Sequence, residues 1–187
     1  PTTGCGSAEV QFDALIDGQG SPVTYAWDFG NGNTGTEATA NQVYNAPGTY
    51  GVSLQTSIGG YVLNNVAVGG VNDNWCGDVE EPSLFGSCTG DPDLYFVLTD
   101  GTGNTFTSAT NDNSTSASWA SVGQVLGNPP YSIAFFDEDL VSQDDDLGTF
   151  NMPQSTTGDV PFTLGNGTFG SLQIDLVPVQ VFNDTDT

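Results

Sequence analysis

The sequence lacks lysine, arginine and histidine altogether, whereas 23 of its 187 residues are aspartate or glutamate, so the formal net charge is −23. No side-chain salt bridge can therefore form within the chain. Every carboxylate must be solvated, hydrogen-bonded to a neutral donor, or neutralised by a bound cation. Binding to nucleic acid is excluded, because neutralising phosphates requires basic side chains. Direct binding to an anionic membrane is disfavoured for the same reason.

The same absence removes most of the groups that enzymes use. Without histidine, lysine or arginine the chain has no Ser-His pair, no cation to stabilise an oxyanion and no usual nucleotide clamp. A glycosidase needs only two carboxylates, but the β-sandwich domains expected below normally offer no deep cleft for a sugar chain. We therefore expect a non-enzymatic protein.

Long apolar runs and strong helix formers are also scarce. No apolar run is long enough to span a membrane. Glycine, asparagine, threonine and serine are abundant, which favours β-structure with many turns. Apolar residues make up 36% of the chain and include 11 Phe, 6 Tyr and 3 Trp, which suffices for a core. The fold class predicted from composition is all-β.

Short apolar runs separated by turn residues predict two β-sandwich domains in tandem. The polar stretch GGVNDN reads as a boundary, so we predict a first domain over residues 1–70, a linker over 71–74 and a second domain with a C-terminal tail over 75–187. The expected strands lie within residues 8–15, 22–30, 48–57, 60–69, 93–100, 115–123, 131–139, 159–165 and 170–182.

Three cysteines bear on the cellular compartment. Cys76 and Cys88 lie twelve positions apart in one loop-like stretch, and we predict a disulfide between them. Closing a loop of that size contributes about 3 kcal/mol in the chain-entropy model. Such a bond implies an oxidising, extracellular location. Cys5 is then left over, either as a buried thiol or as a link to another chain.

The first domain resembles the PKD domain, an immunoglobulin-like module of bacterial surface proteins and secreted enzymes. The resemblance rests on VQFDA, YAWDFGNG and VYNAPGTYGVSLQTS, which cover about residues 7–70. It implies a sandwich in which Trp27 and Phe29 face Tyr50, Val52 and Leu54. Some members of the family bind calcium with acids in loops near the Asp-Phe-Gly turn. Asp17 and Asp28 are the local candidates here.

The second domain resembles the C-two domain, the calcium-dependent sandwich of synaptotagmin and protein kinase C. The resemblance rests on GDPDLYFVL, on Trp119, on LGNPPYSIAFFD and on FFDEDLVSQDDDLG, and covers about residues 75–182. It implies a calcium site. The predicted ligands, with Asp78 favoured over Glu80 and Glu81 as the acid that precedes Asp91, are Asp78, Asp91, Asp137, Asp139 and Asp145.

The chemistry of the residues supports calcium at this place. Six carboxylates lie between Asp137 and Asp146 with no basic residue beside them, so they would repel one another without a cation. Asp137 and Asp139 point the same way on an extended chain, because side chains repeat every two residues. Calcium takes six to eight oxygen ligands. Zinc is disfavoured, because histidine is absent and the cysteines are expected to pair. The alternative is a solvated acidic loop.

Three extracellular, non-enzymatic roles remain open. The first is a self-assembling subunit of a surface fibre or tube, a homo-oligomer held by calcium and edge-strand contacts. The second is a monomeric adhesion or spacer segment, with calcium bridging to an acidic polysaccharide or cell surface. The third is a carbohydrate-binding accessory module, for which Trp75, Trp119 and Tyr131 are the aromatic candidates. Asn113, Asn166 and Asn183 begin glycosylation sequons.

Overall fold

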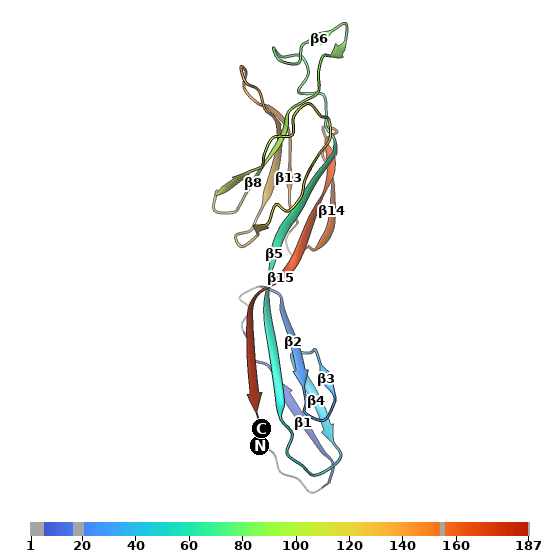
Figure 1. Ribbon diagram of the computed structural model, residues 1–187, viewed down its shortest axis with the longest axis vertical. Coiled ribbons are helices and arrows are strands. Elements are labelled where there is room, and N and C mark those ends of the chain that lie inside the picture. The colour runs from blue at the N-terminus through green and yellow to red at the C-terminus, as the bar shows by residue number, and fades with distance from the viewer. Residues whose placement is uncertain (1–5, 17–20, 154–155, 187) are drawn as a thin grey trace. The chain divides into compact units, whose positions relative to one another are not determined.

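The computed structural model describes residues 6–16, 21–153 and 156–186, and this part of the chain is built from β-strands and their connections (Figure 1). The predicted all-β class is confirmed. The strands are β1 (Ala8–Asp13), β2 (Val23–Asp28), β3 (Thr34–Gly35), β4 (Thr39–Tyr44), β5 (Val52–Gly70), β6 (Ser83–Leu84), β7 (Ser87–Cys88), β8 (Leu94–Thr99), β9 (Thr105–Thr107), β10 (Ala117–Trp119), β11 (Gln124–Val125), β12 (Ser132–Asp137), β13 (Asp145–Asn151), β14 (Gly158–Thr163) and β15 (Phe169–Asp186). Within these residues no helix has the length and hydropathy needed to span a membrane.

The chain divides into two compact units, but not at the predicted linker. The first unit combines residues 1–60 with 177–187, and the second comprises residues 61–176. The stretch 71–74 belongs to the second unit, because Asn72 is buried there and its side-chain amide donates to the Leu147 carbonyl oxygen at 3.0 Å. The boundary near 71 and the assignment of the C-terminal segment to the second domain are therefore corrected.

The first unit is a sandwich of two small sheets. One sheet pairs β1 with β4 in antiparallel register, from Ala8 opposite Tyr44 to Asp13 opposite Thr39. In the other sheet β2 lies between β3 and the first part of β5. The aromatic side chains of Phe12, Trp27 and Phe29 meet between the sheets, with ring centroids 5.5–6.0 Å apart.

The last strand of the chain forms an edge of the first unit (Figure 1). Residues 177–186 of β15 lie beside residues 52–60 of β5: the Gln55 side-chain amide donates to Asn183 Oδ1 at 3.0 Å. A Cβ atom added at Gly60 would lie 2.9 Å from Val179, so the approach of the two strands requires glycine there. The segment that closes this sheet thus comes from the opposite end of the chain.

The second unit is a larger sandwich around one core. One sheet has the order β13-β12-β8-β9. The facing layer contains β14, residues 169–176 of β15 and residues 61–70 of β5, with β10 and β11 paired to β5. Phe135 of β12 and Phe162 of β14 stack between these layers with their ring centroids 5.1 Å apart. This core fixes the end of β12, where the acidic run begins.

Candidate metal centre

A disulfide holds the first group of acids. Cys76 and Cys88 are bonded, with their Cα atoms 5.5 Å apart, which confirms the predicted pairing. The enclosed segment turns tightly after Gly77, whose backbone N–H donates to the Glu81 carbonyl oxygen at 2.9 Å. Inside this turn Asp78 Oδ1 accepts the backbone N–H groups of Glu80 at 3.0 Å and Glu81 at 2.8 Å. The Asp78 carboxylate is therefore fixed by its own turn.

The second group of acids follows β12. Buried and more exposed residues alternate along this strand, and the alternation continues for two residues past its end at Asp137. Asp137 is therefore 1% and Asp139 9% exposed, whereas Glu138 between them is exposed. Asp137 Oδ1 accepts the backbone N–H of Asp93 at 2.5 Å. Asp145, the first residue of β13, lies directly opposite Asp137 in the register of the two strands. The two-residue repeat places these carboxylates on one side, as predicted.

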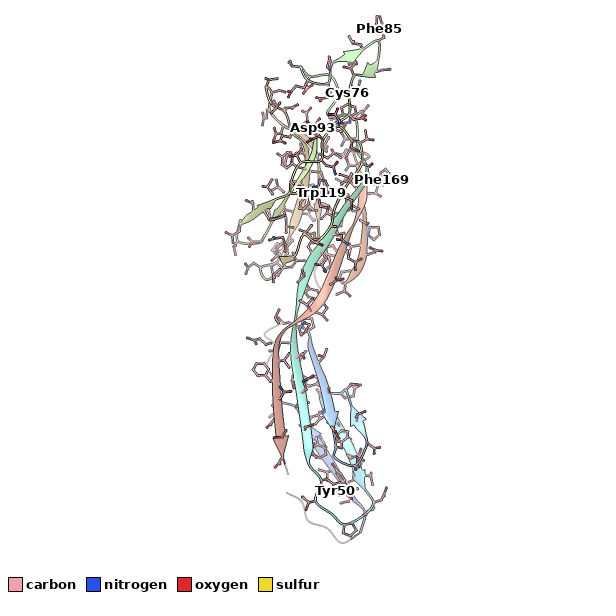
Figure 2. The ribbon with its side chains drawn as sticks, in the orientation of Figure 1. Tyr50, Cys76, Phe85, Asp93, Trp119 and Phe169 are labelled. Atoms are coloured by element: carbon pink, nitrogen blue, oxygen red, sulfur yellow. A yellow bond between two sulfur atoms is a disulfide. The ribbon has the colours of Figure 1, made fainter. Side chains whose placement is uncertain are left out.

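The two groups converge. One carboxylate oxygen from each of Asp78, Glu81 and Asp139 lies within 4.8 Å of the others. The charges of Asp78, Asp93 and Asp145 all act on Asp137. We call Asp78, Glu81, Asp137, Asp139 and Asp145 the carboxylate cluster. Figure 2 shows Asp93 and Cys76 at the same end of the second unit, where the cluster lies.

Several oxygens of the carboxylate cluster are buried without a donor. Among the described residues, Glu81 Oε2, Asp137 Oδ2 and both carboxylate oxygens of Asp139 are shielded from solvent and accept no hydrogen bond. A buried polar atom without a partner costs roughly 1–3 kcal/mol, and more when it is charged. The chain has no basic side chain that could pair with these oxygens.

The pKa values of the carboxylate cluster express the same conflict. Burial, reinforced by the charges of Asp137 and Asp78, raises the pKa of Glu81 to about 7. Burial and the neighbouring Asp78 raise the pKa of Asp139 to about 7, and burial with the charges of Asp93 and Asp145 raises that of Asp137 to about 6. Burial also raises the pKa of Asp145. Asp78 differs: the backbone N–H of Glu81 lowers its pKa.

The loop between β12 and β13 is docked onto the disulfide segment. Glu80 Oε2 accepts the backbone N–H of Leu140 at 2.6 Å, and the Ser142 hydroxyl donates to Asp78 Oδ2 at 3.3 Å. The side chains of Leu140 and Val141 remain 89% and 72% exposed at the tip of this loop. Glu80 therefore positions the loop and does not enter the carboxylate cluster.

The remaining acids of the run between Asp137 and Asp146 have neutral donors of their own. Glu138 Oε2 accepts the Thr110 hydroxyl at 2.6 Å, and Asp144 Oδ2 accepts the Tyr95 hydroxyl, also at 2.6 Å. Asp146 Oδ1 accepts the backbone N–H of Gly148 at 2.8 Å. The acidic run thus divides into three residues satisfied by the protein and three that face the cluster.

Four of the five predicted ligands come together, and one does not. Asp78, Asp137, Asp139 and Asp145 belong to the carboxylate cluster, whereas Asp91 is exposed and lies outside it. Glu81, which the sequence offered only as an alternative to Asp78, joins the cluster alongside it. Asp93 was not singled out from the sequence, although its backbone N–H and its charge both act on Asp137. Its position two residues after Asp91, which is one side-chain repeat of an extended chain, was the available signal.

The first unit gives less support to a metal site. Asp28 is exposed and its Oδ1 accepts the backbone N–H of Gly30 at 2.9 Å, so it caps the turn after β2. Asp17, the other candidate, and Cys5 lie outside the described residues.

The aromatic residues considered for sugar binding do not form an exposed row. Trp75 is 7% and Tyr131 8% exposed. Trp119 is half-buried, stacks edge-on against Phe96 and donates its indole N–H to the Ala109 carbonyl oxygen at 2.7 Å. All three are part of, or packed against, the core of the second unit.

Comparison with known proteins supports the family resemblance of the first part of the chain. Residues 1–65 match the family model of the PKD domain, which confirms that part of the expected resemblance. The chain is also similar to collagenase ColA of Bacillus cereus, with 41% identity over 56 residues. That similarity covers 29% of this chain and 6% of the collagenase, so the chain spans a small part of this relative.

Proposed function

We propose that this chain is a non-enzymatic extracellular structural protein whose second unit binds calcium through the carboxylate cluster. The observation that carries the proposal is the set of buried oxygens on Glu81, Asp137 and Asp139 that lack any donor. Calcium accepts several carboxylate oxygens from flexible segments, which matches the donor set here. The ion would offset repulsion among acids that the chain cannot neutralise itself. The expected resemblance of this unit to the C-two domain remains part of the proposal.

Isothermal titration calorimetry of the full chain with calcium at pH 7.5 tests this proposal. We expect saturable binding that is strongly weakened by Asp139→Asn, because this change removes one charge from the centre of the carboxylate cluster. The control is Asp159→Asn, which removes the same charge from an exposed position on β14. Absence of saturable binding up to millimolar calcium, or equal weakening by both substitutions, would refute the calcium site.

Three features support an extracellular, non-catalytic role. The disulfide between Cys76 and Cys88 requires an oxidising compartment. The PKD match covers residues 1–65, and PKD domains resembling this one occur in secreted and surface proteins. Finally, the carboxylates that converge among the described residues are those that a metal would occupy, which disfavours their use as an acid–base pair.

We further propose that the protein assembles into a surface fibre or tube when calcium is present. Apolar side chains are exposed in the same part of the second unit: Leu140 and Val141 on the docked loop, and Phe85 farther out at the tip of the β6–β7 hairpin (Figure 2). Bound calcium would reduce the negative charge around them, so that a second copy could cover them and align sheet edges. Nucleic acid and direct membrane contact are not part of this proposal, because both require basic side chains.

Sedimentation of the chain in millimolar calcium and in excess chelator tests the assembly. We expect large particles with calcium that dissociate on chelation, and a smaller response from Phe85→Ser and Leu140→Ser. A monomer in both conditions would refute the fibre while leaving the calcium site to be judged by calorimetry.

The similarity to collagenase ColA supports a second candidate, an accessory or spacer module of a larger secreted protein. This candidate predicts a monomer at all calcium concentrations. Sugar recognition by Trp75, Trp119 and Tyr131 is not favoured within it, because these side chains are buried or half-buried.

A further inference from the structure

The sandwich of the first unit is open along one side. A groove of about 850 Å³ runs between β1 and the end of β15, and its walls carry polar surface and a somewhat larger share of apolar surface. Its lining includes Val10, Phe12, Trp27, Tyr50, Leu54 and Phe182. All of these residues belong to the first unit, and Figure 2 labels Tyr50 in it.

The open side leaves the core of this unit underfilled. Among the described residues of this unit, Trp27, Phe29 and Tyr44 are the buried hydrophobic side chains, whereas seventeen hydrophobic residues are buried in the core of the second unit. Val10 and Phe12 alternate inward along β1, but they stay partly exposed. Side chains that point inward from a strand and still contact solvent indicate that a covering element is missing.

The backbone along the groove also lacks a partner. β1 pairs with β4 in a two-stranded sheet, and within the described part of the chain no strand pairs with its other edge. A free strand edge next to an apolar groove is the arrangement that accepts an added strand, because backbone groups supply hydrogen bonds and the groove takes alternate side chains.

The charge around the groove identifies the kind of strand. Asp13, Asp184 and Asp186 lie among the residues that line it. Asp13 Oδ1 accepts the Thr39 hydroxyl at 2.8 Å and the Gln11 amide at 3.1 Å, and these bonds lower its pKa, so it is ionised at neutral pH. No basic side chain exists in this chain to offset these acids.

We propose that this groove binds an extended β-strand of a different protein, with apolar side chains at alternate positions and lysine or arginine between them. The apolar side chains would cover Val10 and Phe12, the backbone would pair with β1, and the basic side chains would meet Asp13 and Asp184. A second copy of this chain cannot supply such a strand, because it contains no lysine or arginine and carries a charge of −23 itself. β1 has six residues, so the bound segment is about 20 Å long.

Three synthetic peptides of equal length separate the contribution of the apolar side chains from that of the basic side chains. Each peptide is tested against the full chain in chelator, so that calcium-driven assembly is absent. The first alternates valine with lysine, the second valine with glutamate, and the third serine with lysine. We expect the valine–lysine peptide to bind at least tenfold more tightly than either of the others, since each lacks one of the two required features. Hydrogen exchange of the β1 amides should slow only with the first peptide.

A substitution locates the charge contact. Asp184→Asn should weaken the valine–lysine peptide severalfold, and Asp159→Asn in the second unit should not, although both remove one negative charge. Equal binding of the serine–lysine peptide would mean attraction to the whole acidic chain and would overturn the proposal. Unchanged hydrogen exchange of the β1 amides with the valine–lysine peptide would also overturn the proposal. If the β1 amides exchange more slowly at higher protein concentration without peptide, the groove binds a second copy of the chain, and the proposal is again overturned.

Discussion

Replacing Asp137 with asparagine should have opposite effects in the absence and in the presence of calcium. Asp137 is 1% exposed, and its surroundings raise its pKa from 3.8 to about 6. At pH 8 we therefore expect the ionised carboxylate to lower the folding stability of the calcium-free protein, by up to about 3 kcal/mol relative to a neutral group. Asparagine keeps the oxygen that accepts the Asp93 backbone N–H and removes the charge.

Without calcium we therefore expect Asp137→Asn to raise the free energy of unfolding of the second unit by up to about 3 kcal/mol. With calcium the same change removes a charged ligand. If affinity falls tenfold, the stabilisation that a fixed calcium concentration provides falls by about 1.4 kcal/mol. The higher stability without calcium and the smaller stabilisation by calcium have the same cause, which is removal of the unpaired charge of Asp137.

Hydrogen exchange of the β8, β12 and β13 amides measures both quantities within the second unit. It is run on wild type, Asp137→Asn and Asp159→Asn at pH 8, in chelator and in millimolar calcium. The reasoning is refuted if Asp137→Asn speeds exchange in chelator, because the carboxylate would then stabilise the fold by itself. An undiminished calcium response would also refute it.

Three further predictions concern pH, the disulfide and a turn. In chelator, the second unit should lose stability as pH rises from about 5 to about 8, measured by urea unfolding. The raised pKa values of Glu81, Asp137 and Asp139 mean that the folded state binds more protons than the unfolded chain in this window. Calcium should make the stability depend less on pH. Cys88→Ser should cost about 3 kcal/mol of stability and lower calcium affinity in calorimetry, since the segment that carries Asp78 and Glu81 is freed; unchanged affinity would contradict this. In thermal unfolding, Gly30→Ala should destabilise the first unit by several kcal/mol more than Gly32→Ala. Both glycines have positive φ, but only at Gly30 would an added Cβ lie 2.3 Å from the Gly51 carbonyl oxygen. Equal destabilisation by the two substitutions would show that the clash with Gly51 contributes nothing beyond the backbone strain that both share.

Strands with regular apolar alternation were predictable from the sequence, and those held by pairing were not. Residues 22–30 and 131–139 contain β2 and β12 as expected. β4 was not expected, because TANQVY is largely polar and becomes a strand by pairing with β1. β13 was read as an acidic loop, and it is stabilised by its register with β12. Apolar alternation reports the buried face of a strand. In β4 that face includes the polar Gln42, and in β13 the alternation is interrupted at Gly148.

The two glycines at residues 59 and 60 lie where one strand was predicted as two. The strands 48–57 and 60–69 were expected on either side of them, and paired glycines are typical of turns. They form one continuous strand, β5, because Gly60 faces Val179 of β15 without room for a side chain. Glycine permits both a turn and a close approach of two strands, and the choice depends on a segment more than a hundred residues away.

The carboxylate cluster was predictable where it depends on local sequence, and not where it depends on contacts between distant segments. The two-residue repeat of a strand was enough to bring Asp137 and Asp139 together. The choice between Asp78, Glu81 and Asp91 depended on how the disulfide segment lies against the end of β12. That geometry is set by non-local bonds, such as those of Glu80 to the backbone of the β12–β13 loop, which local sequence patterns do not encode.

The contrast within the acidic run explains why composition alone does not make every carboxylate a ligand. Glu138 and Asp144 belong to the same run as Asp137 and Asp139 and share the same lack of basic partners, yet each accepts a hydroxyl group from a neighbouring residue. The difference is access to donors: both carboxylate oxygens of Asp139 and one of Asp137 lack a donor, whereas Glu138 and Asp144 each have a hydroxyl donor. A chain with basic residues could place one among them and dispense with the ion. This chain cannot, so its buried carboxylates are relieved by protonation as the pH falls through their raised pKa values and, under the proposed function, by an external cation at higher pH.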